Sequence, residues 1–298
     1  MSEPKPLTLV TAFGPSLERA VLLAAHPDER YRRDGNPVAD RRSLVLRLDG
    51  ERAVVEEELG VPLVRSWYSS SGVGYCSTHE SNLLWKWEQG RWSTEEFSDR
   101  RVDMIRHVFG FAGARPEDDE LWMCTEGALL HRVAGTWTRH EVTQRFPYQI
   151  HGLSPSEVYI GGDELLRYDG SAFEELESPS DDETSALWVT PDDRLIVGYR
   201  KLSLSTADGQ WERIETSFSC YMLMAELERR IFAATSGDGV VTVYPGPVER
   251  SSPPFEVNRL VAVGDGLIAV GDDQSMAYDG RRWWTIQMPI GGAFAPIR

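Results

Sequence analysis

The residues of this chain that most invite a chemical interpretation are a histidine and two acids in the segment VLLAAHPDER, residues 21–30. His26, Asp28 and Glu29 are of the kinds that bind zinc or transfer protons. A zinc ion needs three or four such ligands converging on one point. The other five histidines are dispersed along the chain, and no two histidines form an H-x-x-H pair. The segment by itself therefore predicts no metal site.

The same segment is similar to the AHPDDE signature of the zinc-dependent N-acetylglucosaminyl deacetylases. That resemblance implies that His26 and an aspartate bind zinc and that another aspartate is the base. One acidic residue of the signature is missing here, and so are the downstream H-x-x-H pair and the alternating α/β pattern of that family. We interpret the match as coincidence, and we expect no metal ion and no cofactor.

A second candidate is the serine cluster Ser69-Ser70-Ser71-Gly72, which His79 and Glu80 follow. A catalytic triad needs a nucleophile on a strained turn and a base that an acid orients. The chain has no G-x-S-x-G sequence, and a run of serine and glycine is typical of a plain loop. The spacings of calcium loops and nucleotide-binding loops are absent as well. We therefore predict that the chain is not an enzyme.

Most of the other unusual residues belong to a repeat in which a short apolar run ends in a glycine turn. The glycines lie 40, 45, 35, 39, 37 and 34 residues apart, and an aromatic or large apolar residue usually follows within four positions. Units of this length predict a repeat architecture. The seven turns are Asp49-Gly50, Gln89-Gly90, Ala134-Gly135, Asp169-Gly170, Asp208-Gly209, Pro245-Gly246 and Asp279-Gly280.

Each repeat contains runs of five to seven residues that alternate between apolar and polar, which predict strands. Clear examples are EVYIGGDELLRYDGSAFEEL (157–176) and GLIAVGDDQSMAYDGRRWWTIQM (266–288). A weaker run before each unit, such as MIRHVFGFAG (104–113), supplies a fourth strand. Four antiparallel strands repeated every ~40 residues predict the blade of a β-propeller.

We therefore expect an all-β fold in which residues 1–298 form a single β-propeller of seven four-stranded antiparallel blades. Six or eight blades are alternatives, because the two ends of the repeat are divergent. The first blade carries an arginine-rich insertion at 29–42, ERYRRDGNPVADRR. Aromatic residues after the turns are expected to pack between blades, with exposed sugar-stacking sites as the alternative. They are Trp92, Trp137, Phe173, Trp211 and Trp283 or Trp284.

The repeat resembles the bacterial propeller repeats of the form LWAVGDGGTILHYDGSTW, and it lacks the Gly-His and Trp-Asp pairs of WD40 repeats. The resemblance covers residues 44–288. It implies a propeller architecture and says little about activity, since such folds host many functions.

The charge of the chain bears on its partners. With 31 Lys and Arg against 47 Asp and Glu, the formal net charge is -16, which argues against nucleic acids and anionic membranes. A basic protein fits better, although the charge also keeps a protein soluble. The amino terminus lacks a signal-peptide pattern, no 18-residue apolar stretch occurs, and the three cysteines are scattered. We expect a cytoplasmic monomer.

In a propeller, the turn between the second and third strands of each blade lies at one end of the channel, among the loops that carry binding sites. Five of six such turns contain a carboxylate, and one contains Arg200-Lys201. We predict that this face docks a basic protein, for example as an immunity-type inhibitor of a bacterial toxin. A channel-based carbohydrate hydrolase or lyase, and a scaffold without a dedicated partner, are the alternatives. The predicted contact residues are His79, Glu80, Glu126, Asp163, Glu164, Asp181, Asp182, Asp238, Asp272 and Asp273.

Overall fold

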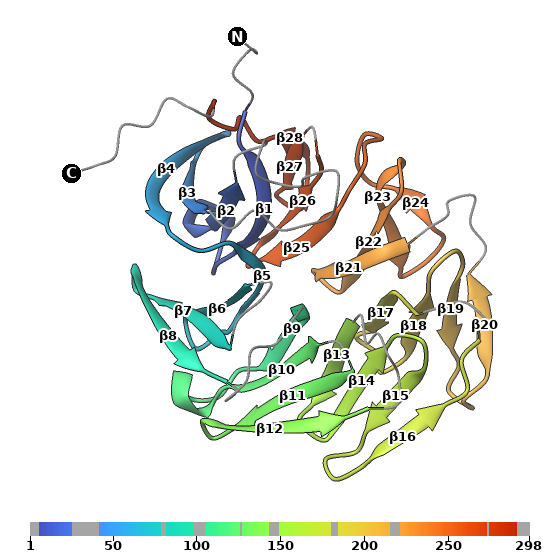
Figure 1. The fold of residues 1–298 in the computed structure, drawn as a ribbon. Coiled ribbons are helices and arrows are strands. Elements are labelled where there is room, and N and C mark those ends of the chain that lie inside the picture. The colour runs from blue at the N-terminus through green and yellow to red at the C-terminus, as the bar shows by residue number, and fades with distance from the viewer. Residues whose placement is uncertain are drawn as a thin grey trace, which may run out of the picture.

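Seven four-stranded sheets make up the part of the chain that the structure, a computed structural model, describes. The described residues are 6–25, 42–78, 82–97, 105–125, 127–142, 149–179, 184–214, 221–272 and 274–290. In every sheet the strands follow chain order and pair antiparallel with their neighbours. The sheets are arranged as blades around a central axis (Figure 1). The predicted all-β propeller with seven antiparallel blades is confirmed.

The first strand of each blade lies next to the axis, and the fourth lies at the outside (Figure 1). Blades 1 to 4 consist of β1 (Thr8–Phe13), β2 (Val21–Ala25), β3 (Ser43–Asp49), β4 (Arg52–Leu59), β5 (Leu63–Tyr68), β6 (Val73–Thr78), β7 (Leu83–Glu88), β8 (Arg91–Glu96), β9 (Ile105–Phe111), β10 (Glu120–Thr125), β11 (Ala128–Val133), β12 (Thr136–Glu141), β13 (Gln149–Ser154), β14 (Glu157–Gly161), β15 (Leu165–Tyr168) and β16 (Phe173–Leu176). Blades 5 to 7 consist of β17 (Ala186–Val189), β18 (Leu195–Gly198), β19 (Leu202–Ser205), β20 (Trp211–Ile214), β21 (Tyr221–Leu227), β22 (Arg230–Thr235), β23 (Gly239–Tyr244), β24 (Glu249–Arg250), β25 (Arg259–Val263), β26 (Gly266–Val270), β27 (Ser275–Tyr278) and β28 (Trp283–Thr285).

All seven glycine turns join the third strand of a blade to the fourth. In Gln89-Gly90 the φ angles are 49° and 80°, and in Ala134-Gly135 they are 46° and 77°. Two consecutive positive φ angles are the type I′ geometry that suits the twist of a two-residue hairpin. The glycine of each turn thus allows the outer hairpin to close, which is the role the repeat predicts.

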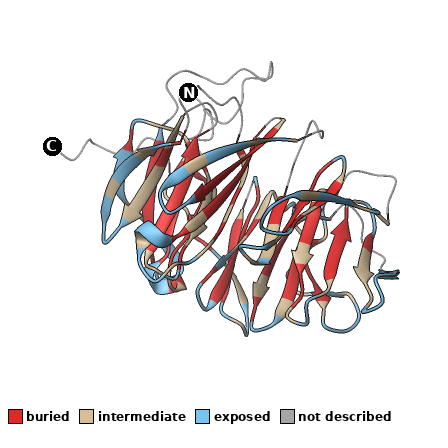
Figure 2. Ribbon diagram, turned by 90° about the horizontal axis from the view of Figure 1, so that it is seen from below, coloured by how far each residue is buried: buried red, intermediate tan, exposed pale blue. Residues whose placement is uncertain are grey.

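The apolar faces of the blades are buried against one another. Seven clusters of buried hydrophobic residues lie among the described residues, one at each interface between neighbouring blades. The sheet interiors are buried while the outer strands and turns are exposed (Figure 2). The predicted aromatic residues all pack against these clusters, as expected: Trp92, Trp137, Phe173, Trp211, Trp283 and Trp284.

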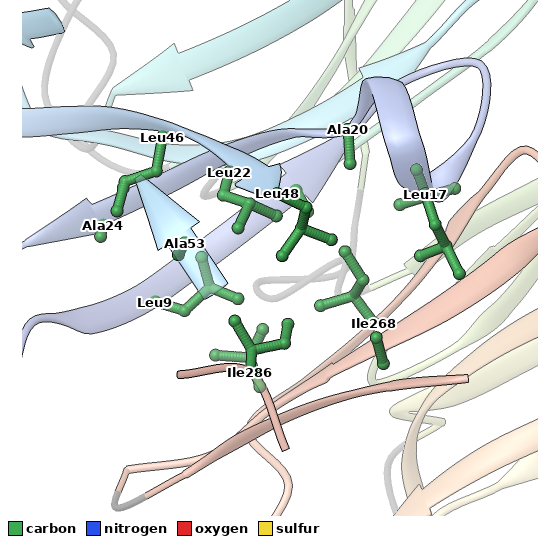
Figure 3. Packing of buried hydrophobic residues seen from close by; sticks show 14 of the residues in the cluster. Leu9, Leu17, Ala20, Leu22, Ala24, Leu46, Leu48, Ala53, Ile268 and Ile286 are labelled. Carbon is green, nitrogen blue, oxygen red and sulfur yellow. The ribbon is translucent and has the colours of Figure 1, made fainter. Parts of the chain in front are cut away.

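Blade 7 meets blade 1 without exchanging a strand, since β1 pairs with β2 and β28 with β27. Instead, residues 286–290 leave β28 and cross to blade 1; we call them the C-terminal strap. The Gln287 N–H donates to the Glu51 carbonyl (2.8 Å), and the Leu7 N–H donates to the Pro289 carbonyl (2.8 Å). Ile286 enters the apolar cluster shared by the two blades (Figure 3). The strap therefore joins the two ends of the chain.

Residues 17–19 form a short 3-10 turn, Leu17–Arg19, which β2 follows. Within the described ranges, no helix is long and apolar enough to cross a membrane. Most of the predicted insertion at 29–42 lies outside the described residues; Arg42 is described, and its Nη1 pairs with Glu58 Oε1 at 2.5 Å.

The outer strands carry much of the negative charge. Together the seven fourth strands contain ten glutamates against five arginines. Each of these strands is the outer edge of its sheet, and charged side chains on such an edge discourage pairing with another chain. Part of the net charge thus has a structural explanation that needs no partner.

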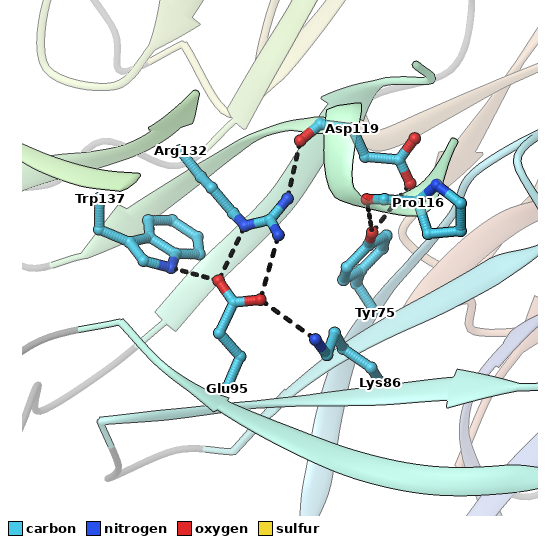
Figure 4. Close-up of polar contacts among 7 residues, drawn as sticks. All are labelled: Tyr75, Lys86, Glu95, Pro116, Asp119, Arg132 and Trp137. Carbon is cyan, nitrogen blue, oxygen red and sulfur yellow. Dashed lines mark hydrogen bonds and ion pairs between the residues drawn. The ribbon is translucent and has the colours of Figure 1, made fainter. Parts of the chain in front are cut away.

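One blade interface holds a buried polar network in addition to apolar contacts (Figure 4). The Glu95 carboxylate on β8 accepts bonds from Arg132 Nε (2.8 Å) and Nη2 (3.2 Å) on β11, and from Trp137 Nε1 (2.8 Å) on β12. Arg132 also donates through Nη1 to the Asp119 carbonyl at 2.8 Å. Burial raises the pKa of Glu95, but the bonds from Arg132 and Trp137 outweigh it and leave that pKa below its usual value. Blades 2 and 3 are therefore linked by a desolvated ion pair.

Replacing Glu95 with glutamine is expected to lower the free energy of unfolding by about 2–4 kcal/mol, because Arg132 loses its carboxylate while it stays buried. The folded pKa of Glu95 is lowered, so its contribution is fully present above about pH 4.5 and is lost as the pH falls through the folded pKa. Urea unfolding at pH 7 and pH 4 should show a smaller difference between wild type and variant at pH 4. Glu96→Gln, at the exposed end of the same strand, is the control and should change stability by less than about 0.5 kcal/mol. Equal effects of the two substitutions would contradict the role assigned to the pair.

The C-terminal strap offers a second test. Ile286→Ala should lower the free energy of unfolding by about 2–5 kcal/mol, because Ile286 is 2% exposed and its removal leaves a cavity where blades 7 and 1 meet. Ile290→Ala is the same substitution in the same strap at a residue that is 54% exposed, and it should be nearly neutral. If both variants unfold at the wild-type urea concentration, the strap does not contribute to closure.

Candidate functional site

A cavity of about 250 Å³ lies at the axis of the ring. Its walls come from the first strands of all seven blades, which contact one another around the axis. These inner strands are β1, β5, β9, β13, β17, β21 and β25. The cavity is therefore the place where side chains from every repeat meet.

The third residue of each inner strand from β5 to β25 lines the cavity. Because side chains on a strand alternate in direction, residues at the same position of equivalent strands point to the same side. In β1 the register shifts after Leu9, and Thr11 occupies the wall instead. The resulting tier consists of Thr11, Arg65, His107, His151, Trp188, Leu223 and Val261.

This tier is divided into a polar arc and an apolar arc. Blades 1 to 4 contribute a hydroxyl, a guanidinium and two imidazoles, and blades 5 to 7 contribute Trp188, Leu223 and Val261. Hydrogen bonds between neighbouring blades hold the polar arc. Arg65 Nε donates to the Arg106 carbonyl (2.5 Å), and the Ile150 N–H donates to His107 Nδ1 (3.1 Å).

Each of the two histidines, His107 and His151, is held in one tautomer and one protonation state. The Val189 N–H donates to His151 Nδ1 at 3.2 Å, as the Ile150 N–H does to His107. An imidazole nitrogen that accepts a bond carries no proton, so we assign the proton of each neutral ring to Nε2. The pKa of His107 is lowered to about 3, mainly by burial and to a smaller extent by the charge of Arg65. The pKa of His151 is lowered to about 3 as well, mainly by burial and to a smaller extent by His107. Both rings are therefore neutral near pH 7, with Nε2–H as a donor.

The cavity can donate hydrogen bonds and offer positive charge. Arg65 and Arg259 supply guanidinium groups, and none of the described residues that line it is an aspartate or glutamate. Glycoside hydrolysis usually uses a pair of carboxyl groups. The described wall instead offers neutral imidazoles, which donate a hydrogen bond through Nε2–H.

The predicted contact residues fall into two groups. His79, Glu80, Glu126, Asp181, Asp182 and Asp273 lie outside the described residues. The described members are Asp163, Glu164, Asp238 and Asp272, and they lie in the turns between the second and third strands of blades 4, 6 and 7. Antiparallel topology places these turns and the equivalent turn of blade 5 at one end of the ring. We call residues 162–164, 199–201, 236–238, 271, 272 and 274 the second-turn rim.

Carboxylates of this rim differ in their contacts. Asp163 and Asp272 are exposed. Asp238 pairs with Arg250 Nη2 at 2.8 Å, and Asp272 accepts a bond from Asn258 Nδ2 at 2.6 Å. Blade 5 adds the exposed basic residues Arg200 and Lys201, as the sequence indicates.

At the opposite end of the ring, aspartates of the glycine turns accept hydrogen bonds from the backbone of their own turn. Asp169 accepts bonds from the backbone N–H groups of Ser171 and Ala172, both at 2.8 Å. Asp279 accepts bonds in the same way from Arg281 and Arg282, both at 2.9 Å. These bonds hold the pKa of both carboxyls below its usual range. The Asp-Gly pairs are therefore explained by turn closure.

The structure describes part of the two catalytic motifs that the sequence analysis set aside. His26, Asp28 and Glu29 lie outside the described residues. Ser71 Oγ donates to Asp119 Oδ2 at 2.8 Å, which ties the β5–β6 turn to blade 3. Among the described residues, no group of three or more His, Cys, Asp and Glu side chains is placed to hold a metal ion.

The cavity residues were missed by the sequence analysis. Arg65, His107, His151 and Trp188 do stand at one position of four consecutive inner strands. Aligning the weak first strands of the repeat, in place of the well-marked glycine turns, would have brought these four side chains together.

The pH dependence of stability tests the state of the two histidines. The unfolded chain binds more protons than the folded chain between about pH 6.5 and 3, so their contribution is complete above pH 6.5 and is lost as the pH falls toward 3. In the double variant His107→Asn, His151→Asn an amide oxygen can still accept the backbone N–H. Between pH 7.5 and pH 5, wild type should lose more stability than this variant, by on the order of 1 kcal/mol per histidine, in urea unfolding. Equal losses would contradict the neutral assignment.

Several solved structures have a similar fold. A catalytically inactive variant of virginiamycin B lyase from Staphylococcus aureus with quinupristin is 10% identical, with a TM-score of 0.69 over 92% of this chain and 95% of that chain. YCF48 bound to D1 peptide is 13% identical, with a TM-score of 0.65 over 93% of this chain and 95% of that chain. The WD40 propeller domain of Doa1 is 8% identical, with a TM-score of 0.66 over 95% of this chain and 96% of that chain. No family model and no curated protein matches the chain.

These comparisons correct one prediction. We predicted that the chain is not an enzyme, because it lacks familiar catalytic motifs. Virginiamycin B lyase is an enzyme with the same architecture, so neither the propeller nor the missing motifs support that prediction. At 10–13% identity the likeness shows the fold alone, and it assigns no reaction to this chain.

Proposed function

We propose that this chain is a protein-binding propeller that docks a basic partner on the second-turn rim. The observation that carries the proposal is the topology, which gathers Asp163, Glu164, Asp238 and Asp272 at one end of the ring although they are far apart in the sequence. Loops at one end of a rigid scaffold are where propellers and other folds carry binding sites. The chain's net charge of -16 adds to the negative potential at that end.

The comparisons are compatible with a protein partner. YCF48, which has the same fold, is bound to a peptide in its solved structure. A rigid ring presents many turns at once, so it can contact an extended segment without reorganising. The basic character of the partner rests on the rim acids of this chain and not on the relatives.

Electrostatic attraction would act mainly on the rate of association. An exposed ion pair contributes about 0–1 kcal/mol, so four carboxylates cannot account for a tight complex by themselves. Complementary charge steers the encounter and fixes orientation, and apolar contacts supply most of the remaining affinity. An immunity-type inhibitor of a basic bacterial toxin, acting in the cytoplasm, is one form of this function; it rests on the sequence.

The test compares three forms of the protein as immobilised bait. The rim variant carries Asp163→Asn, Glu164→Gln, Asp238→Asn and Asp272→Asn. The control carries Glu174→Gln, Glu175→Gln, Glu212→Gln and Glu249→Gln, which changes the net charge equally on the exposed outer strands. Wild type and control should retain a basic protein from the native host that the rim variant does not retain.

The affinity for that protein should then be measured at several salt concentrations. We expect the rim variant to bind at least about tenfold more weakly at low salt and to show a flatter salt dependence, because fewer charges are screened. A partner that binds the rim variant and wild type equally, or that is lost from the outer-strand control as well, would remove the rim from the interface.

A further inference from the structure

The central cavity has the features of a binding site that is separate from the second-turn rim. Its volume of about 250 Å³ is near the lower end of the range for ligand pockets, so it suits a small molecule. A cavity lined only by apolar groups would follow from blade packing. This one has a polar arc whose side chains are held by bonds across four blade interfaces. Such bonds fix the direction of donors before any ligand enters.

Charge inside the cavity is opposite to the charge of the chain. Arg65 and Arg259 are cations at any physiological pH, and the described lining contains no carboxylate. The charge of Arg65 helps to lower the pKa of the neighbouring His107, so it acts on another side chain that lines the cavity. The neutral imidazoles add Nε2–H donors and no acceptor. Two cations and two donors in a partly desolvated space favour an anion.

The aromatic wall of the cavity is also fixed in place. The ring of His151 lies between Trp188 (centroids 3.9 Å apart) and Phe109 (5.1 Å). Trp188 Nε1 donates to Glu226 Oε2 at 3.4 Å, which directs its ring. Leu223 and Val261 continue this wall on the apolar arc. A flat apolar body would contact these side chains without displacing them.

Polar and apolar ends of the cavity follow from strand direction. Arg259 and Gln149 are the first residues of β25 and β13, so they lie at the end of the ring that carries the second-turn rim. Trp67 and Phe109 are the fifth residues of β5 and β9, so they lie farther along the axis. Residues one, three and five of a strand share a face, and all four of these side chains line the cavity.

We propose that the central cavity binds a small aromatic carboxylate, with the carboxylate at Arg65 and Arg259 and the ring against Trp188. The guanidinium groups recognise the carboxylate, and the Nε2–H groups of His107 and His151 are further donors of the same tier. The aromatic body occupies the apolar arc. Arg65, His107, His151 and Trp188 are already held by bonds to neighbouring blades, so their side chains need not rearrange when the ligand binds.

The experiment is calorimetric titration of the full chain with 2-naphthoate. The neutral analogue 2-naphthamide has the same shape, and N-acetyl-Gly-Gly-Phe with a free carboxylate represents the end of a peptide chain. We expect 2-naphthoate to bind at least about tenfold more tightly than the amide, because a hydrogen bond to a charged group contributes about 1.5–3 kcal/mol. It should also bind more tightly than the peptide, whose longer body does not suit a cavity of about 250 Å³. Equal affinity for the amide, no binding at millimolar concentration, or tighter binding of the peptide would overturn the proposal.

Three variants locate the site. Arg259→Gln should weaken 2-naphthoate binding about tenfold or more, whereas Arg281→Gln, the same substitution at an exposed residue of a glycine turn, should leave it unchanged. Val261→Phe adds volume to the apolar arc without changing charge, and it should abolish binding in a protein whose circular dichroism remains that of wild type. Arg259→Gln and Val261→Phe variants that fold and bind as wild type does would place the ligand elsewhere and overturn the assignment.

Discussion

Every feature of this molecule depends on one constraint, which is that a four-stranded sheet with two apolar faces has to bury both of them. No blade can do so alone, and the seven hydrophobic clusters of the described residues lie between blades and not within one. Each blade is therefore stabilised by two neighbours, as in other repeat proteins. The ring removes the two end faces that an open stack of blades would leave in water.

Closure is the demanding step, because blades 7 and 1 come from opposite ends of the chain. Elsewhere a short connection holds neighbouring blades together, and here only non-covalent contacts do. The C-terminal strap holds blades 7 and 1 together through backbone hydrogen bonds to β4 and to the start of blade 1. In addition, an oxygen of Asp265 in blade 7 accepts a bond from the Leu17 N–H at 3.1 Å. Ile286 packs with Leu9, Leu22 and Ile268 beneath these bonds (Figure 3). A ring closed in this way can be complete without sharing a strand between its ends.

The sequence predicts those parts of the structure that short-range physics determines. The glycine turns need positive φ, and the space between blades needs an aromatic or large apolar residue at the outer strand. Both features recur along the chain, so blade number and topology could be inferred. The network of Glu95 and Arg132 could not, because its members come from two repeats and their pairing depends on how the blades pack. The same applies to His107, whose bond partner Ile150 lies on the next blade. The resemblance to a particular class of bacterial repeats stays a prediction, since the comparisons show only the fold.

The inner strands carry different kinds of side chain at the position that faces the cavity, and that difference has a physical reason. Positions between blades must fill a space of fixed width, so equivalent residues there stay apolar. The third position of an inner strand, or the fourth in β1, faces the cavity at the axis, so the packing of one sheet on the next imposes no single side chain there. There the chain has placed a guanidinium, two imidazoles and an indole within one tier. Arg65 and His107 are held by hydrogen bonds to neighbouring blades, so the ring fixes the positions of their polar groups. Where the scaffold leaves a position free and the chain nevertheless fixes a costly polar group at it, binding or chemistry at the axis is the simplest physical explanation.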